Sequence, residues 1–379
     1  MIGNWSYPTA IRFGPGRIEE LPLACREAGI SRPLLVTDRG IAGLSITERA
    51  LSILEESGFG RALFADVGPN PTDRNLNAGI EAFLEGGFDG VVGFGGGSGL
   101  DLGKMIAFMA GQSRPVWDFE DIGDYWKRAD ADAIRPSVAV PTTAGTGSEV
   151  GRASVITNTE TRVKKIIFHP KVLPKQVICD PELTIGLPPA ITAGTGMDAF
   201  AHCLEAYCAP GFHPMSQGIA IEGMRLVRKS LRRAYRCPDD LEARADMMSA
   251  ASMGAVAFQK GLGAIHALSH PAGALFDTHH GTTNAVVMQA VLEFNRPEIE
   301  SKLALAAAYL GVGDSFAAFS GFAAELHAEL ELPSGLRDLG VQPEAIDLMT
   351  EMALKDPCAG SNPVTMTRET TRRLYQLTI

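Results

Sequence analysis

The chain has 379 residues, about twice the length that one hydrophobic core usually serves, so the sequence predicts two domains. Hydrophobic residues make up 45% and charged residues 21%, a balance that is typical of folded globular proteins and excludes a disordered chain. The net charge of -10 argues against nucleic acid as a partner, because binding to phosphates needs clustered basic charge.

The start of the chain, MIGNWSYP, lacks the basic and apolar segments of a signal peptide, and no long apolar run follows it. We therefore expect a cytoplasmic protein with no membrane partner. The six cysteines are scattered without a CxxC pair, and we expect them to be free thiols.

In the first half of the chain, short apolar runs alternate with stretches of helical periodicity. This βαβ rhythm predicts a parallel sheet that is covered on both faces. Beyond two adjacent prolines, Ala-, Leu- and Met-rich segments of helical period continue to the C-terminus. We therefore predict an α/β domain over residues 1–187 and an all-α domain over 188–379. The predicted strands are 33–38, 62–67, 90–94, 137–140 and 177–180, the predicted helices of the first half are 47–57 and 75–85, and a hairpin is expected around 154–168.

A glycine-rich turn, GGGSGLDLGK, follows the predicted strand 90–94 and precedes an apolar helical stretch. Glycines let the backbone approach a phosphate, whose negative charge is favoured by free amides and the helix dipole. The alternative is a tight strand-to-helix turn with Ser98 as the N-cap. The spacing differs from the GxGxxG of an ordinary Rossmann domain.

A second polar loop, PTTAGTGSE, follows the predicted strand 137–140. Because parallel strands place their carboxyl ends at one crevice, the two loops together suit a pyrophosphate and a ribose. The alternative for this loop is a turn in which Ser and Thr bond their own backbone. Asp38, at the end of the first clear strand, is placed to accept hydrogen bonds from an adenosine ribose or to cap a helix.

Four of the eight histidines lie in one short segment of the second half. His266 and His270 are four residues apart, as are Asp198 and His202 upstream, so each pair shares a helix face. A lone histidine on an apolar face is usually a hydrogen-bonded core residue, but two such pairs in one helical domain favour a metal site. Nitrogen and oxygen donors without thiolate suit Fe²⁺ or Zn²⁺.

Four blocks in fixed order carry a family resemblance: GGGSGLDLGK, PTTAGTGSEV, GTGMDAFAHCLEAY and GLGAIHALSHPAGALFDTHHGTTNAVV. The chain resembles the iron-containing (group III) alcohol dehydrogenases from the Trp5–Gly14 strand region to its C-terminal helices. The resemblance implies a nucleotide-binding α/β domain and a helical domain in the arrangement shared with dehydroquinate synthase. It also implies an active site between the two domains and at least a homodimer.

The resemblance further implies a role for individual residues. His270 would lie near the nicotinamide as a catalytic residue outside the ligand set, and His279 would be only a neighbour of the metal. NAD is expected rather than NADP, because Asp38 would repel a 2′-phosphate. The implied metal ligands are Asp198, His202, His266 and His280, and the implied cofactor-binding residues are Asp38, Asn70, Gly97, Ser98, Asp101, Thr142, Thr143, Thr146 and Lys164, with a simple turn as the alternative for Asn70.

The implied reaction is hydride transfer between nicotinamide C4 and the carbon of an alcohol whose oxygen is bound to the metal. The segment around Lys260 and the residue Arg152 add two cations that can pair with a carboxylate, so we expect a hydroxy acid or semialdehyde as substrate. The alternative is that both are solvated surface charges. The candidate substrate residues are Phe258, Lys260, Leu262 and Arg152.

Two other functions remain open on the same scaffold. A metal-dependent lyase or cyclase of the dehydroquinate synthase type would also use NAD, but it needs a Lys- and Arg-rich pocket for a phosphorylated acid, and the chain lacks an obvious one. A non-enzymatic nucleotide-sensing protein would be expected to lose metal ligands, and all four are present.

Overall fold

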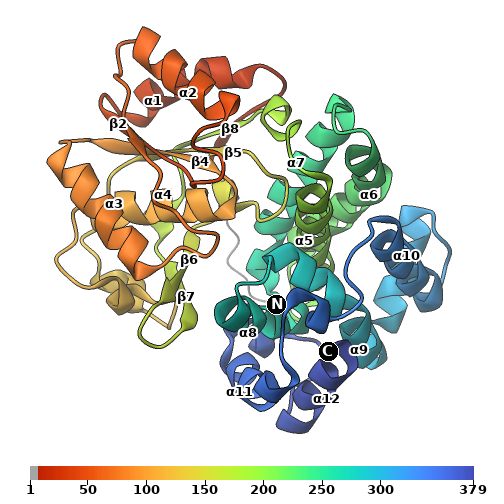
Figure 1. The fold of residues 1–379 in the computed structure, drawn as a ribbon. Coiled ribbons are helices and arrows are strands. Elements are labelled where there is room, and N and C mark those ends of the chain that lie inside the picture. Colours follow the sequence, from red (N-terminus) through yellow and green to blue (C-terminus); the bar gives the residue numbers. More distant parts are fainter. Residues whose placement is uncertain (1–6) are drawn as a thin grey trace. The chain divides into compact units, whose positions relative to one another are not determined.

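The computed structural model describes residues 7–379, which form two compact units. The sheet unit comprises Tyr7–Thr143 and Gly147–Thr184, and the helical unit comprises Ala144–Thr146 and Ile185–Ile379 (Figure 1). The division lies close to the predicted end of the first domain at residue 187. Residues Trp5 and Ser6 of the predicted first strand region lie outside the described residues.

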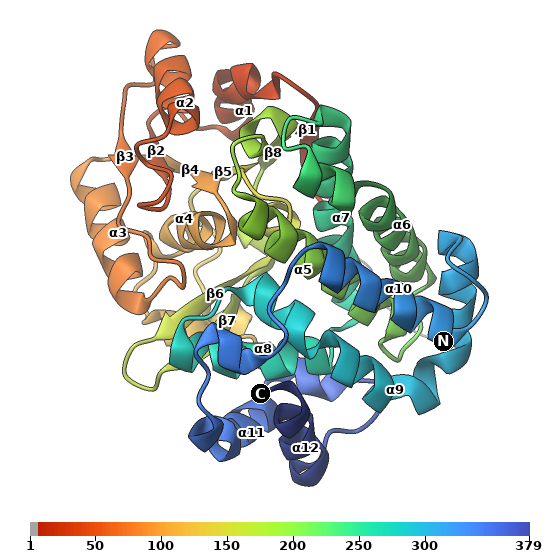
Figure 2. The same ribbon diagram turned by 45° about the vertical axis from the view of Figure 1, so that its right-hand side comes forward.

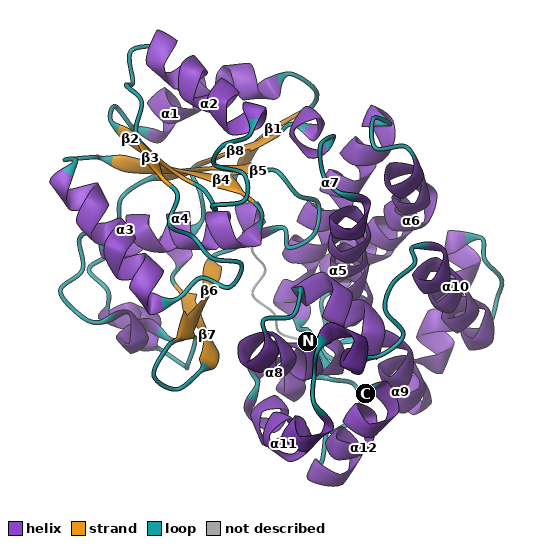
Figure 3. Cartoon of the chain, viewed as in Figure 1, coloured by secondary structure: helices purple, strands orange, loops and turns teal. Residues whose placement is uncertain are grey.

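Six parallel strands form the central sheet of the sheet unit, in the order β1-β8-β5-β4-β2-β3 (Figure 3). A separate antiparallel hairpin, β6 with β7, occupies the region where a hairpin was predicted. The strand predicted at 62–67 is shorter than expected. The strands are β1 (Ala10–Phe13), β2 (Pro33–Val36), β3 (Leu63–Phe64), β4 (Gly90–Gly95), β5 (Ser137–Pro141), β6 (Ala153–Asn158), β7 (Val163–Phe168) and β8 (Gln176–Cys179).

Helices cover both faces of this sheet (Figures 1 and 2). Leu34 and Val36 of β2 point into the core beneath α3 and α4, whereas Leu35 points into the core beneath α1 and α2. Burial on both faces explains why the strands are continuous apolar runs in the sequence. The four helices are α1 (Leu21–Ala28), α2 (Ser45–Glu56), α3 (Asp73–Glu85) and α4 (Gly97–Met109).

Helix α4 approaches β4 closely at two glycines of the GGGSGLDLGK turn. A Cβ on Gly103 would lie 3.0 Å from the Cα of Gly93, and a Cβ on Gly99 would lie 3.0 Å from the carbonyl oxygen of Phe94. Side chains at these positions would push the helix off the sheet. These two glycines, which are not among the predicted cofactor residues, therefore serve helix-sheet packing.

The helical unit is organised around α5, which is almost entirely buried and packs against α6, α7 and α9. The described residues of this unit contain no strand, so the predicted architecture of an α/β domain followed by an all-α domain is confirmed. Between residues 7 and 379, no helix is both long enough and apolar enough to cross a bilayer. The helices are α5 (Pro189–Cys208), α6 (Pro214–Arg236), α7 (Leu241–Ala257), α8 (Ala264–Phe276), α9 (His280–Leu310), α10 (Phe316–Glu329), α11 (Ile346–Lys355) and α12 (Arg368–Thr378).

We predict that Gly103→Ala destabilises the protein by about 1–3 kcal/mol, because the added methyl group meets backbone that cannot rotate away. The matched control is Gly218→Ala in α6, where a Cβ meets no atom within 4 Å and the change only removes a glycine from a helix interior. Urea or thermal unfolding measures both variants. Equal stability of the two would contradict the packing role of Gly103.

Candidate metal centre

Four side chains of the helical unit bring donor atoms together: Asp198 and His202 from α5, His266 from α8, and His280 from the first turn of α9. Their ligand atoms all lie within 4.8 Å of one another. The Nε2 atoms of His202 and His266 each lie 3.8 Å from Oδ1 of Asp198, and that of His280 lies 3.5 Å from it. Three of the four side chains are buried.

Small residues allow these helices to meet. A Cβ on Gly281 of α9 would collide with the carbonyl oxygen of Gly194 of α5 and would lie 2.9 Å from the Cβ of Asp198. The two helices therefore touch through their backbones at the first turn of α9, which places His280 beside Asp198. Asp277, with φ of 53°, ends α8 in a left-handed conformation, so the chain turns at once into α9.

The four donors fit a single divalent cation. The separations of 3.5–3.8 Å are too long for hydrogen bonds. They are close to the spacing of about 3.4 Å expected for donors about 2.1 Å from a tetrahedral ion. Oε2 of Glu205 lies 2.6 Å from Nδ1 of His266 and fixes the ring proton there, so the lone pair on Nε2 faces the carboxylate of Asp198. Nδ2 of Asn284 donates to Oδ1 of Asp198 and lies 3.3 Å from Nε2 of both His266 and His280, and a divalent cation suits the same set of acceptors.

The protonation state of His202 agrees with metal ligation. Burial lowers the pKa of His202 to about 4, so this imidazole is neutral at physiological pH, the form that binds a metal. Burial also acts to lower the pKa of His266, but Glu205 and Asp198 outweigh it and the pKa is raised. Asn284, buried in α9, donates from Nδ2 to Oδ1 of Asp198 at 2.8 Å and so holds the carboxylate in place.

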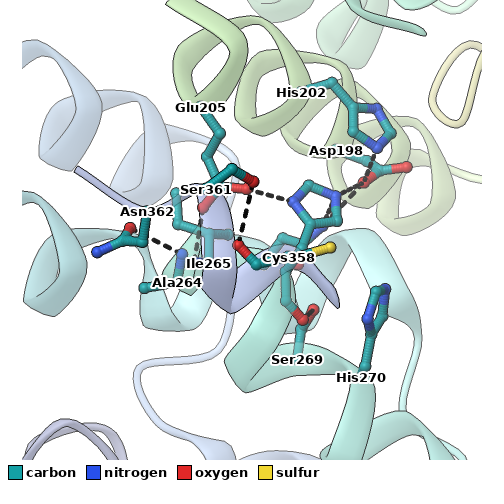
Figure 4. Close-up of polar contacts among 12 residues, drawn as sticks. Asp198, His202, Glu205, Ala264, Ile265, Ser269, His270, Cys358, Ser361 and Asn362 are labelled. Carbon is teal, nitrogen blue, oxygen red and sulfur yellow. Dashed lines mark hydrogen bonds and ion pairs between the residues drawn. The ribbon is translucent and has the colours of Figure 1, made fainter. Parts of the chain in front are cut away.

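Glu205 is a site residue that the sequence reasoning missed. It lies one turn after His202 on α5, and Figure 4 shows Asp198, His202 and Glu205 on this helix. Besides its contact with His266, its Oε1 accepts the backbone N–H of Ile265 at 2.7 Å, so one carboxylate holds both the ring and the start of α8. Glu205 follows His202 by three residues, so the two lie on the same face of α5. This spacing is the only feature of the sequence that could have identified Glu205 as a site residue.

His270 lies outside the four donors, one turn after His266 on α8 (Figure 4). Its Nδ1 is 2.7 Å from Oδ2 of Asp356, and its ring stacks on that of His280 with centroids 5.4 Å apart. Although burial acts to raise the pKa of Asp356, His270 and hydrogen bonds lower it overall. His279 accepts the backbone N–H of Thr282 and caps α9, so its role is local.

In the sheet unit, three predicted cofactor segments follow the adjacent strands β2, β4 and β5 at their carboxyl ends. Asp38 follows β2, Gly97 and Ser98 open α4, and Thr142 with Thr143 follows β5. No side chain caps α4, whose N-cap is Gly96, and this leaves its N-terminus suited to an anion. The alternative of Ser98 as the N-cap is wrong, because its hydroxyl donates to the carbonyl of Pro69 at 2.5 Å.

Asp101 has a structural task. Its carboxylate accepts hydrogen bonds from Oγ of Ser148 at 2.5 Å and from the backbone of Val155 at 2.9 Å. Lys104, only 3% exposed, lies beside it and donates to the carbonyls of Ser148 and Ala153. The first turns of α4 therefore anchor the segment that follows the second polar loop. Both oxygens of Asp101 take part in this anchor, and its role as a direct cofactor contact stays a prediction.

Two other cofactor candidates, Asp38 and Thr146, lie in different units of the chain. Oδ1 of Asp38 accepts the backbone N–H groups of Gly40 and Ile41, so this oxygen caps a turn and not a helix, because the N-cap of α2 is Leu44. Oδ2 faces Gly95, where a Cβ would lie 3.5 Å from it. Thr146 belongs to the helical unit, apart from Thr142 and Thr143, within a segment that packs on α5.

Lys164 lies in β7, opposite Thr157 of β6. The backbone N–H of Thr157 donates to the carbonyl of Pro71, so the hairpin brings Lys164 close to the loop that holds Asn70. Two candidates far apart in the sequence are thus neighbours within the sheet unit.

The two cations predicted to bind a substrate carboxylate are engaged elsewhere. Lys260 lies in a short 3₁₀ helix (Phe258–Lys260) and donates to the carbonyl of Tyr207 at the end of α5. Burial and the neighbouring Lys302 lower the pKa of Lys260 to about 8, so it is not a solvated surface charge. The guanidinium of Arg152, in the sheet unit, lies over the ring of Phe168. The role of both side chains toward a substrate carboxylate stays a prediction.

The two apolar substrate candidates differ in their placement. The ring of Phe258 contacts that of His202, with centroids 5.2 Å apart, so it borders the donor set. Leu262 is half-buried in the loop between the 3₁₀ helix and α8.

We predict that Glu205→Gln weakens metal binding by about 10–100-fold. A glutamine amide directed at Nδ1 of His266 would donate to it and favour the ring proton on Nε2, the atom that faces the metal site. Glu222→Gln, a surface change beside Arg225 on α6, is the control and should bind metal normally. Competition with a chelator measures both affinities, and an unchanged affinity in Glu205→Gln would refute the role of the carboxylate.

Comparison with known proteins agrees with this geometry. Residues 8–181 match the family model described as iron-containing alcohol dehydrogenase, and residues 192–379 match the C-terminal model of the same family. The chain is 40% identical to 4-hydroxybutyrate dehydrogenase of Cupriavidus necator, over 98% of both proteins. It shares a TM-score of 0.95 and 35% identity with the crystal structure of a 1,3-propanediol oxidoreductase, over 100% of both chains.

A further solved structure is sulfoacetaldehyde reductase from Bifidobacterium kashiwanohense in complex with NAD⁺. It gives a TM-score of 0.90 at 28% identity and covers 100% of this chain and 99% of its own. The family models together span nearly the whole chain, and the blocks that suggested the resemblance lie inside them. The chain therefore belongs to the iron-containing alcohol dehydrogenase family, and the reaction class predicted from its sequence, that of an alcohol dehydrogenase, is confirmed.

Proposed function

We propose that this dehydrogenase uses NAD and one Fe²⁺ ion to interconvert a short primary alcohol and its aldehyde, the alcohol carrying a second polar group at its other end. The observation that carries the proposal is the convergence of Asp198, His202, His266 and His280, whose ligand atoms all lie within 4.8 Å of one another. A dinucleotide would bind at the uncapped start of α4 and the loop after β5 in the sheet unit.

When bound, the metal supplies Lewis-acid polarisation of the substrate oxygen and the nicotinamide supplies or accepts the hydride. The chain itself contributes positioning. Glu205 keeps the proton of His266 on Nδ1, Asn284 holds one oxygen of Asp198, and Phe258 packs on His202, so each donor is fixed in direction. His270, beside His280, is the group we assign to a hydrogen bond with the substrate hydroxyl.

Iron rather than zinc is proposed for the metal because the matching family model is that of iron-containing enzymes. The donor set itself, three imidazoles and one carboxylate without thiolate, suits both ions. Reconstitution of metal-free protein with each ion under anaerobic conditions decides between them. We expect Fe²⁺ to restore the higher turnover.

NAD is proposed as the preferred cofactor because the carboxylate of Asp38 disfavours a 2′-phosphate. We predict that Asp38→Asn brings the kcat/KM values for NAD and NADP closer together. The variant keeps an acceptor for the N–H groups of Gly40 and Ile41, so the turn is preserved while the charge is lost. Equal kcat/KM for both cofactors in the unchanged protein would overturn this assignment.

The substrate class is proposed from the relatives. The 4-hydroxybutyrate dehydrogenase and the 1,3-propanediol oxidoreductase are both named for short chains with a terminal hydroxyl and a second polar group at the far end. We place 4-hydroxybutyrate first because its dehydrogenase is 40% identical to this chain. Since Lys260 already binds the end of α5, it has no part in this proposal.

We predict that the Fe²⁺-loaded protein reduces NAD with 4-hydroxybutyrate at a higher kcat/KM than with 1,3-propanediol or 1-butanol, followed by nicotinamide absorbance. His280→Ala should lose metal and activity together, since it removes one of the four donors. Lys260→Ala should leave the ratio of kcat/KM for acid and butanol unchanged. NAD reduction that persists without metal, or no reduction with any alcohol, would refute the function, whereas a better rate with 1-butanol would refute only the substrate.

A further inference from the structure

A segment close to the C-terminus holds α8, the helix that carries His266 and His270. This segment runs through the 3₁₀ helix Pro357–Ser361, and at its end Oδ1 of Asn362 accepts the backbone N–H of Ala264, the first residue of α8, at 2.9 Å. From α12, the hydroxyl of Tyr375 donates to the carbonyl of Leu268 at 2.9 Å. These two hydrogen bonds hold the backbone of α8 in place independently of any contact between the segment and a histidine side chain.

Asp356, at the start of this segment, contacts both the backbone and the side chain of Cys358 as well as the ring of His270. Its Oδ1 accepts the backbone N–H of Cys358 at 2.9 Å and so caps the 3₁₀ helix. Its Oδ2 lies 2.7 Å from Nδ1 of His270, and only 11% of the Asp356 side chain and 15% of the His270 side chain are exposed. The contact with His270 is the one that bears on the candidate active site.

The carboxylate decides which nitrogen of His270 carries the proton. A neutral imidazole has one N–H and one acceptor, and a carboxylate at Nδ1 accepts the N–H there, leaving the acceptor lone pair on Nε2. The ring stacks on His280 at an interplanar angle of 16° and meets His266 edge-on at 68°. The ring of His270 thus contacts two of the four donors, His266 and His280, and its orientation is set by the hydrogen bond between its Nδ1 and Asp356.

We infer that Asp356 is the positioning residue of His270, which it holds in the Nδ1–H tautomer so that Nε2 accepts a hydrogen bond from the substrate hydroxyl. The inference rests on the proposed function, in which His270 contacts the substrate. Asp356 itself touches neither the donor set nor the substrate, and its effect is transmitted through the ring of His270. The alternative is that Asp356 serves only as the cap of the 3₁₀ helix.

Two variants separate these roles. Asp356→Asn keeps an oxygen for the N–H of Cys358 but turns an amide N–H toward Nδ1 of His270, which favours the proton on Nε2 and removes the acceptor. Asp356→Ser keeps a capping hydroxyl but is too short to reach the ring. Asp347→Asn, an exposed change on α11 beside Arg372, controls for the loss of one negative charge.

We expect both Asp356 variants to lower kcat for the best alcohol by about 10–100-fold, as removal of an outer hydrogen-bond partner does at comparable sites. Metal content, melting temperature and the KM for NAD should remain those of the unchanged protein, because neither the donors nor the cap is altered. In a His270→Ala background the same substitutions should cause no further loss, since the residue through which they act is absent. Asp347→Asn should have full activity.

A second readout does not depend on turnover. In protein labelled with ¹⁵N-histidine and loaded with diamagnetic Zn²⁺, the ring nitrogen shifts of His270, assigned by their absence in His270→Ala, report the tautomer. We expect the Nδ1–H form in the unchanged protein and the Nε2–H form in Asp356→Asn.

Losses that add to that of His270→Ala, an unchanged kcat in Asp356→Asn, or the same tautomer in both proteins would overturn the inference and leave Asp356 as a helix cap. Each of these results counts against the inference only if the unchanged protein oxidises alcohols with NAD. If that protein shows no NAD-linked oxidation of any alcohol, the proposed function fails instead.

Discussion

The metal centre depends on the backbone contact between α5 and α9. Gly194 and Gly281 let the two helices touch where no side chain fits, and this contact brings His280 to Asp198. Helix α5 cannot shift to relieve a poor fit, because α6, α7 and α9 pack around it and nearly all of its residues are buried. The direction of each donor is then set by polar neighbours such as Glu205 and Asn284.

In the sheet unit, a buried cation holds two segments of the chain together. Lys104 is far from solvent, and its charge is stabilised by the carboxylate of Asp101 and the carbonyls of Ser148 and Ala153. This arrangement joins the helix that follows the glycine-rich turn to the chain that follows the second polar loop. The two segments that are expected to bind one dinucleotide are therefore joined to each other in the fold. Two independent turns would each lose conformational freedom when the dinucleotide binds, and that loss would weaken binding.

The sequence predicted the parallel sheet, the helical second half and the four donor residues, because hydrophobic periodicity and the family blocks are local patterns. It did not reveal Glu205 or Asp356, since the partner of each is a histidine far away in the chain and only the folded structure brings them together. The contact of Lys260 with the end of α5 was also not predictable from the sequence. Its position before α8 suggested an open cation, but the end of α5 lies within its reach.

All four donors belong to the helical unit, whereas the uncapped start of α4 belongs to the sheet unit. A ligand that binds only the folded form stabilises the part of the chain that holds it. The proposed ion would join α5, α8 and α9 as a cross-link between distant segments, in a chain whose six cysteines form no disulfide. We therefore expect metal supply to govern how well the helical unit resists heat and proteolysis, and the proposed dinucleotide to do the same for the sheet unit.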